Sequence, residues 1–190
     1  MLDVRALMPE TWDDLVELFS RPGASIPRGC WCMFYRQSGR GADGDRSAAN
    51  RAALRALVDS GSVPGLIGYE DDAPVGWISL SPREEYSKRR RSPVMKPVDD
   101  RPVWSIVCFF VDKHARGRGI TAGLLDAAIR YADEQGATVV EAYPVDKPER
   151  SNDDSMFFGS KRLYDRAGFD EVARRKPARP VVRKELGGTG

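Results

Sequence analysis

Histidine and cysteine are scarce in this chain of 190 residues, with His114 as the single histidine and cysteines only at positions 30, 32 and 108. Cys30 and Cys32 lack the two-residue spacer of structural zinc sites, so we expect no metal site. Three thiols cannot all pair within one chain, and we expect no stabilising disulfide.

Long apolar runs are also missing, because no segment approaches the roughly 18 to 20 residues needed to cross a bilayer. The start, Met1 to Arg5 followed by polar residues, lacks the basic and apolar stretches of a secretory signal. We therefore expect a cytoplasmic protein that does not act at a membrane.

An excess of one charge is absent as well, since 30 basic and 28 acidic residues leave a net charge of +2. This field is too weak to favour dedicated nucleic-acid binding. The densest basic run, Lys88 to Arg91, has no interleaved aromatic residues. Such a run is typical of a solvated loop, while steering of an anionic ligand and contact with an acidic partner or nucleic acid stay open.

The residues that are present fit one globular domain over positions 1–190, with 41% hydrophobic and 31% charged residues. Residues 2–7 alternate between apolar and polar, which predicts a strand. Apolar residues then recur at helical spacing over 12–19 and again over 53–58. Between these two helices, residues 21–45 are rich in Gly, Pro and Ser and predict an irregular segment.

The middle of the chain reads as sheet. Residues 66–69 and 75–80 predict two antiparallel strands joined by a tight turn, and a long charged connection follows over 82–102. Residues 103–111 form a β-branched and aromatic run without alternation, which is typical of a central strand buried on both faces.

The last third predicts a helix over 119–135, a strand over 138–145, a short helix over 160–167, and a final hairpin from 169–173 and 181–184. The strand before the first of these helices and the strand after it should pair in parallel through a right-handed crossover. The sequence therefore predicts a mixed α/β fold.

The turn over residues 112–121 has the order that aims unpaired backbone N–H groups at an anion, because it joins a strand to a helix. Gly117 and Gly119 let a phosphate approach the main chain, while Arg116 and Arg118 can add positive charge. An ordinary basic turn is the alternative for so short a motif.

Residues Arg116-Gly117-Arg118-Gly119-Ile120-Thr121 resemble the acetyl-coenzyme A signature of the GNAT superfamily of N-acetyltransferases, with Thr121 where that signature has Gly or Ala. The segment from Leu163 to Phe169 resembles the late L-Y-x-x-x-G-F segment of these enzymes. Cys30 to Met33 and Val75 to Trp77 resemble segments of a bacterial branch whose members mostly lack assigned substrates.

This resemblance implies a mixed, mostly antiparallel sheet that splays between two parallel strands and is flanked by helices. It implies acetyl-coenzyme A as co-substrate, with its pantetheine held by backbone groups of Phe109 and Val111. The pyrophosphate would be held by the amides from Arg116 to Thr121. The implied reaction is direct acetyl transfer to a primary amine of a small metabolite, a drug-like molecule or a protein.

The resemblance places Tyr164 at the position of a general acid, for which a core tyrosine is the alternative. Asn, common seven residues before that tyrosine, is replaced by Phe157. Glu141 is a candidate base or proton relay, with an exposed strand glutamate as the alternative. A non-catalytic acyl-coenzyme A-binding regulatory module is the rival function.

The aromatic segment from Cys30 to Tyr35, with Trp77 and Trp104, predicts either an acceptor pocket or plain core packing. The oligomeric state stays open, with a homodimer as one arrangement.

Overall fold

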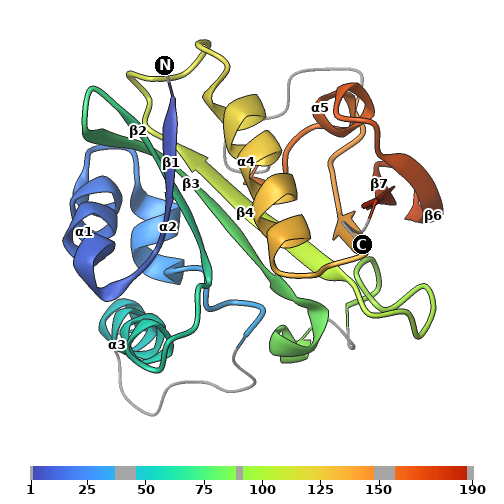
Figure 1. The fold of residues 1–190 in the computed structure, drawn as a ribbon, viewed down its shortest axis with the longest axis horizontal. Helices are drawn as coiled ribbons and strands as arrows, with labels where there is room; N and C mark the ends of the chain where they lie inside the picture. The colour runs from blue at the N-terminus through green and yellow to red at the C-terminus, as the bar shows by residue number, and fades with distance from the viewer. Residues whose placement is uncertain (1, 37–45, 89–91, 148–156, 188–190) are drawn as a thin grey trace.

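A seven-stranded sheet in the order β1-β2-β3-β4-β5-β7-β6 forms the centre of the molecule (Figure 1). The structure is a computed structural model that describes residues 2–36, 46–88, 92–147 and 157–187. The strands are β1 (Asp3–Ala6), β2 (Gly65–Glu70), β3 (Ala73–Pro82), β4 (Trp104–Val111), β5 (Val139–Ala142), β6 (Asp170–Lys176) and β7 (Arg179–Glu185).

Helices cover both faces of this sheet (Figure 1). They are η1 (Pro9–Thr11), α1 (Trp12–Ser20), α2 (Ser25–Cys30), α3 (Arg46–Asp59), η2 (Arg83–Glu85), α4 (Ile120–Glu134) and α5 (Lys161–Arg166). Successive residues of a strand point to opposite faces, and on β3 Trp77 packs in the cluster of α1 while Ile78 packs in the cluster of α4. None of the described helices is long and apolar enough to serve as a membrane span.

The parallel pair predicted from the sequence is β4 with β5, and it is short. Only Trp104, Ser105 and Ile106 pair with β5, opposite Val140 to Ala142. Beyond that point the chain after β5 bonds elsewhere, because the Val145 amide donates to Gly159 O at 2.9 Å and the Lys161 amide donates to Val145 O at 2.9 Å. The two strands therefore separate, and the mostly antiparallel sheet splays as the resemblance implied.

Most predicted elements are confirmed, with two corrections. The segment over 21–45 is not wholly irregular, because residues 25–30 form α2. β5 ends at Ala142 rather than at Val145, since the following residues leave the sheet. Both differences depend on contacts distant in sequence, which local patterns do not carry.

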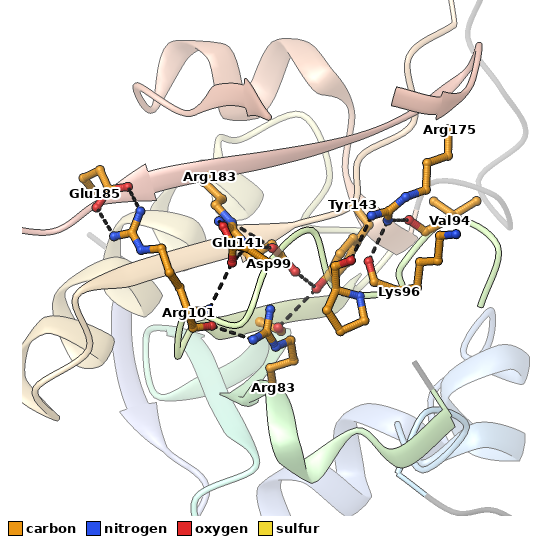
Figure 2. Close-up of polar contacts among 12 residues, drawn as sticks. Arg83, Val94, Lys96, Asp99, Arg101, Glu141, Tyr143, Arg175, Arg183 and Glu185 are labelled. Carbon is orange, nitrogen blue, oxygen red and sulfur yellow. Dashed lines mark hydrogen bonds and ion pairs between the residues drawn. The ribbon is translucent and has the colours of Figure 1, made fainter. Parts of the chain in front are cut away.

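The charged connection before β4 is pinned to the sheet by arginines of the last hairpin (Figure 2). Arg175 donates to the carbonyls of Val94, Lys96 and Pro97 at 2.6 to 3.0 Å. Val94 and Met95 of this connection are buried in a hydrophobic cluster with Tyr143 and Val181. The carbonyls of Val94, Lys96 and Pro97, which belong to no strand, thus find hydrogen-bond donors on Arg175.

Arg183 of β7 is the centre of the same network (Figure 2). It bonds both carboxylate oxygens of Asp99, at 2.6 and 2.9 Å, and Glu141 on β5 at 2.8 Å. Arg101 forms a second, exposed pair with Glu185. Both ion pairs therefore join the connection to β7, and Arg183 extends the network from there to Glu141 on β5.

We expect Asp99→Asn to lower the melting temperature at pH 7 by about 2–4 °C, which corresponds to about 1 kcal/mol for a partly exposed pair. The bonds from Arg183 lower the pKa of Asp99 to about 2, below its unfolded value. The stabilisation is present above pH 4 and is lost as the pH falls toward 2. Melting curves between pH 2 and pH 7 test this.

The exposed Asp100 supplies the matched control, and Asp100→Asn should melt like the wild type throughout this range. If the difference in melting temperature between the wild type and Asp99→Asn stays constant down to pH 2, the stabilisation does not come from the ionised Asp99 paired with Arg183.

Candidate functional site

A cavity of about 640 Å³ lies where β4 and β5 separate, and it is the candidate site. Its floor is residues 107–111 of β4. Its walls come from the start of α4 and the turn before it, from α2 and the loop that follows, from Phe157 and Phe158, and from Arg179 at the start of β7. Segments far apart in sequence therefore meet at the splay, as ligand sites in open sheets commonly require.

Asp112 organises the turn that follows β4. Its carboxylate accepts a bond from the His114 amide at 2.8 Å and from Arg21 Nη1 at 3.1 Å, while its carbonyl accepts the Ala115 amide at 2.9 Å. Burial alone would raise the pKa of Asp112, but the bond from His114 and the Arg21 guanidinium hold it below its usual value. The turn is thus fixed to both β4 and the end of α1.

The two glycines of the turn adopt a left-handed backbone, with φ of +79° at Gly117 and +80° at Gly119. A side chain at either position would meet no atom within 4 Å, so the backbone conformation and not crowding requires glycine. No side chain caps α4 at Gly119, so the positive end of the helix is available to an anion.

The two arginines of the signature have different surroundings. Arg116 lines the cavity and donates to Val111 O at 3.3 Å. Arg118 instead pairs with Glu70 at 3.0 Å and lies outside the cavity lining. The charge of Arg116 therefore faces the candidate site, while that of Arg118 is balanced on the far side of the turn.

Of the other predicted cofactor residues, some line the cavity and one is buried in the core. Phe109, Val111 and Thr121 line the cavity. Ile120 is a core residue with an exposed fraction of 3%, so it can contribute only its backbone. Past Ile106, the edge of β4 that faces the cavity has no parallel partner among the described strands, and an extended ligand with amide groups can bond there.

Tyr164 on α5 lies behind the cavity wall. Its ring is fully buried beside those of Phe109 and Phe169, and its hydroxyl donates to Phe158 O at 3.0 Å. Burial, with a smaller effect from Cys108, raises the pKa of Tyr164 well above its usual value. The hydroxyl is therefore protonated at neutral pH, but it is already engaged.

The expectation that Glu141 is an exposed strand residue is wrong. The side chain is fully buried, accepts from Arg183 and from the Tyr143 hydroxyl, and lies outside the cavity lining. Figure 2 shows Glu141 beside Arg183 and Asp99 of the connection before β4. The structure thus gives Glu141 a partner in the sheet, and Glu141 is not among the described residues that line the cavity.

The aromatic segment after α2 serves two purposes. Phe34 and Tyr35 line the cavity beside Cys30 and Cys32, whereas Trp31 and Met33 are buried in the core. Trp77 and Trp104 do not line the cavity: Trp77 is fully buried and Trp104 packs on Tyr131. Part of this segment therefore packs in the core and part lines the cavity, and an acceptor pocket stays a prediction.

The three cysteines are free thiols, and all of them line the cavity. Burial raises the pKa of Cys30 to about 11, and the contact with Cys32, with burial, raises that of Cys108. These two thiols are neutral at pH 7 and present an apolar surface. Within the described ranges, no three His, Cys, Asp or Glu side chains gather as metal ligands would.

Two cavity residues have no signal in the sequence. Phe158 reaches the site because the chain after β5 pairs with residues 159–161, and Arg179 reaches it because β7 pairs with β5 and the Asp146 amide donates to Ala178 O. The predicted basic run is represented by Lys88, whose ammonium lies 4.8 Å from the centre of the Phe34 ring. Arg89 to Arg91 lie outside the described residues.

Comparisons with solved structures show the same fold at low identity. PaiA N-acetyltransferase of Thermoplasma acidophilum, solved with coenzyme A, is 15% identical with a TM-score of 0.52, covering 98% of this chain and 99% of its own. A GNAT-family acetyltransferase of Streptococcus agalactiae 2603 is 14% identical with a TM-score of 0.57, covering 97% and 95%. A protein of Pyrococcus horikoshii OT3 is 17% identical with a TM-score of 0.56, covering 98% and 99%.

In sequence, no curated protein matches the chain. Residues 31–169 match the acetyltransferase (GNAT) family, a span that holds the splayed strands, the glycine turn and Tyr164. The chain therefore belongs to the acetyltransferase (GNAT) family.

Proposed function

We propose that the protein transfers an acetyl group from acetyl-coenzyme A to a primary amine. The observation that carries this is one cavity whose lining includes Arg116 and Thr121 at the two ends of the glycine turn, the open edge of β4, and several aromatic side chains. A long anionic ligand with amide groups fits the turn and the strand edge, and a second molecule fits beside the aromatic side chains.

The residues at the cofactor end suit acetyl-coenzyme A, which supplies a thioester as acetyl donor when bound. The amides from Arg116 to Thr121 and the guanidinium of Arg116 would hold the pyrophosphate. The β4 edge at Phe109 and Val111 would align the pantetheine arm and orient its reactive end toward the splay.

The acceptor end favours the neutral form of an amine. Its described walls are mainly apolar, with Pro27, Phe34, Phe110 and Phe158 among them, and burial there lowers the pKa of an ammonium group. A neutral amine is the nucleophile that acyl transfer needs. Desolvation thus does part of the work of a base.

Tyr164 is our candidate proton donor for the departing sulfur. Its raised pKa keeps the hydroxyl protonated at neutral pH, and the hydroxyl must exchange the Phe158 carbonyl for the ligand. If the Tyr164 hydroxyl keeps its bond to Phe158, no proton donor for the sulfur is assigned. The candidate base Glu141 is already bonded to Arg183, so the rival function of a non-catalytic acyl-coenzyme A-binding module would then gain support.

We expect saturating acetyl-coenzyme A to raise the melting temperature by roughly 5–10 °C at about 100 times its Kd, because it binds only the folded turn. Free pantetheine should do much less. Arg116→Gln should weaken acetyl-coenzyme A binding by about tenfold or more, since it removes a charge at the cavity. Arg118→Gln is the matched comparison, with a smaller loss expected because Arg118 faces Glu70.

Equal increases in melting temperature with acetyl-coenzyme A and with pantetheine would contradict the proposed pyrophosphate site. Acetyl-coenzyme A-dependent thiol release across a panel of amines then tests transfer itself. Tight binding of acetyl-coenzyme A without release of its thiol in the presence of any amine would favour the binding module.

With an acceptor from that panel, Tyr164→Phe should lower turnover by about 10²-fold while acetyl-coenzyme A affinity stays nearly intact. The substitution keeps the buried ring and removes only the hydroxyl. Steady-state kinetics and calorimetric titration measure the two quantities. Normal turnover would make Tyr164 a core residue that bonds Phe158.

Glu141→Gln separates a base from a structural carboxylate. We expect lower stability, by up to about 3–5 kcal/mol, because the buried Arg183 loses a charged partner. Turnover per folded molecule should stay near normal below the melting temperature. A large loss of turnover in a variant of unchanged stability would instead support a base or relay role for Glu141.

A further inference from the structure

Arg179 is a cation in the cavity wall whose bonding is incomplete. It begins β7, donates from Nη2 to Tyr143 O at 3.2 Å, and stacks with its guanidinium carbon 4.1 Å from the centre of the Phe158 ring. Its Nε is buried and has no hydrogen-bond partner within the described part of the chain. No carboxylate of the described residues forms an ion pair with it.

The other arginines of the same hairpin are fully used. Arg174 pairs with Glu171 and Asp146, Arg183 pairs with Asp99 and Glu141, and Arg175 holds three backbone carbonyls. Arg179 differs from them in lining the cavity. A buried donor on a charged group is costly to leave unmade, so a ligand that accepts from it gains affinity.

Among the described residues, the charge of the cavity wall has one sign. Arg116 at the cofactor end and Arg179 at the other end are the charged side chains of the described lining, and that lining contains no carboxylate. Such a wall repels polyamine-like acceptors, which need acidic partners, and it attracts anions. The remaining acceptor walls are aromatic or aliphatic.

We propose that the acceptor is a small amine with an apolar or aromatic body and a carboxylate, and that Arg179 binds this carboxylate. This rests on the proposed function. The guanidinium offers Nε–H and a second N–H side by side, which matches the two oxygens of a carboxylate. The ring or aliphatic body contacts Phe34, Phe110 and Phe158. The adjacent positive charge also favours the neutral, nucleophilic form of the amine.

The test compares amines that differ only in the carboxylate, by calorimetric titration into the protein saturated with coenzyme A. The pairs are L-phenylalanine with phenethylamine and L-leucine with isoamylamine, and putrescine is the cationic probe. We expect the carboxylate member of at least one pair to bind about 10- to 100-fold more tightly than its partner. Putrescine should bind weakest.

Arg179→Gln should abolish this preference, and Arg179→Lys should keep only part of it, because lysine retains the charge without the fork. Lys176→Gln is the matched control: it removes the same charge from the exposed residue that pairs with Arg179 across the hairpin. This control should keep the wild-type preference. A thermal shift with acetyl-coenzyme A verifies that each variant is folded.

Equal binding within both pairs, a preference that survives Arg179→Gln, tighter binding of putrescine, or no binding by any carboxylate amine would each overturn the proposal. Measuring thiol release from acetyl-coenzyme A distinguishes failure of the proposed role of Arg179 from failure of the proposed function. Faster acetylation of phenethylamine or putrescine than of the amino acids leaves the transferase standing and rejects the role of Arg179. A carboxylate preference lost in Arg179→Gln without any thiol release supports the anion site and rejects the transferase.

Discussion

The short parallel ladder between β4 and β5 is the constraint on which the rest of the site depends. It has three residue pairs and ends at Ile106 and Ala142, because the chain beyond β5 bonds to residues 159–161 instead. Its end leaves one edge of β4 open and places Phe157 and Phe158 opposite that edge. A longer ladder would fill the cavity with backbone and would satisfy the groups that a ligand needs.

The last hairpin links the stability of the fold to the chemistry of the site. Arg175 and Arg183 donate their hydrogen bonds to the connection before β4, and Arg183 also donates to Glu141 on β5. Arg179, at the turn end of the same hairpin, presents its charge to the cavity. One hairpin therefore fixes the connection before β4 and also contributes a positively charged side chain to the described lining of the cavity.

Sequence patterns predicted the elements well where the signal was local. The turn at Gly117 and Gly119 was predicted from its strand-turn-helix order and from glycines that let a phosphate approach the main chain, and the structure adds that both residues have positive φ. Glu141 shows the limit of such reasoning. Its neighbours along the strand say nothing about Arg183, which lies 42 residues later and determines that the carboxylate is buried and paired. The division between Arg116 and Arg118 also required Glu70, on a distant strand.

The sequence by itself determined the mixed α/β class and the strand-turn-helix order at residues 103–135, because periodicity and glycine act over a few residues. That the turn binds an anion stays a prediction. The tertiary structure decided which of these residues face a cavity and which are core. It alone brought Phe158 and Arg179 beside β4 and buried Glu141 against Arg183. Such contacts depend on where the chain leaves the sheet, and that is settled by competition between distant segments for the same backbone hydrogen bonds.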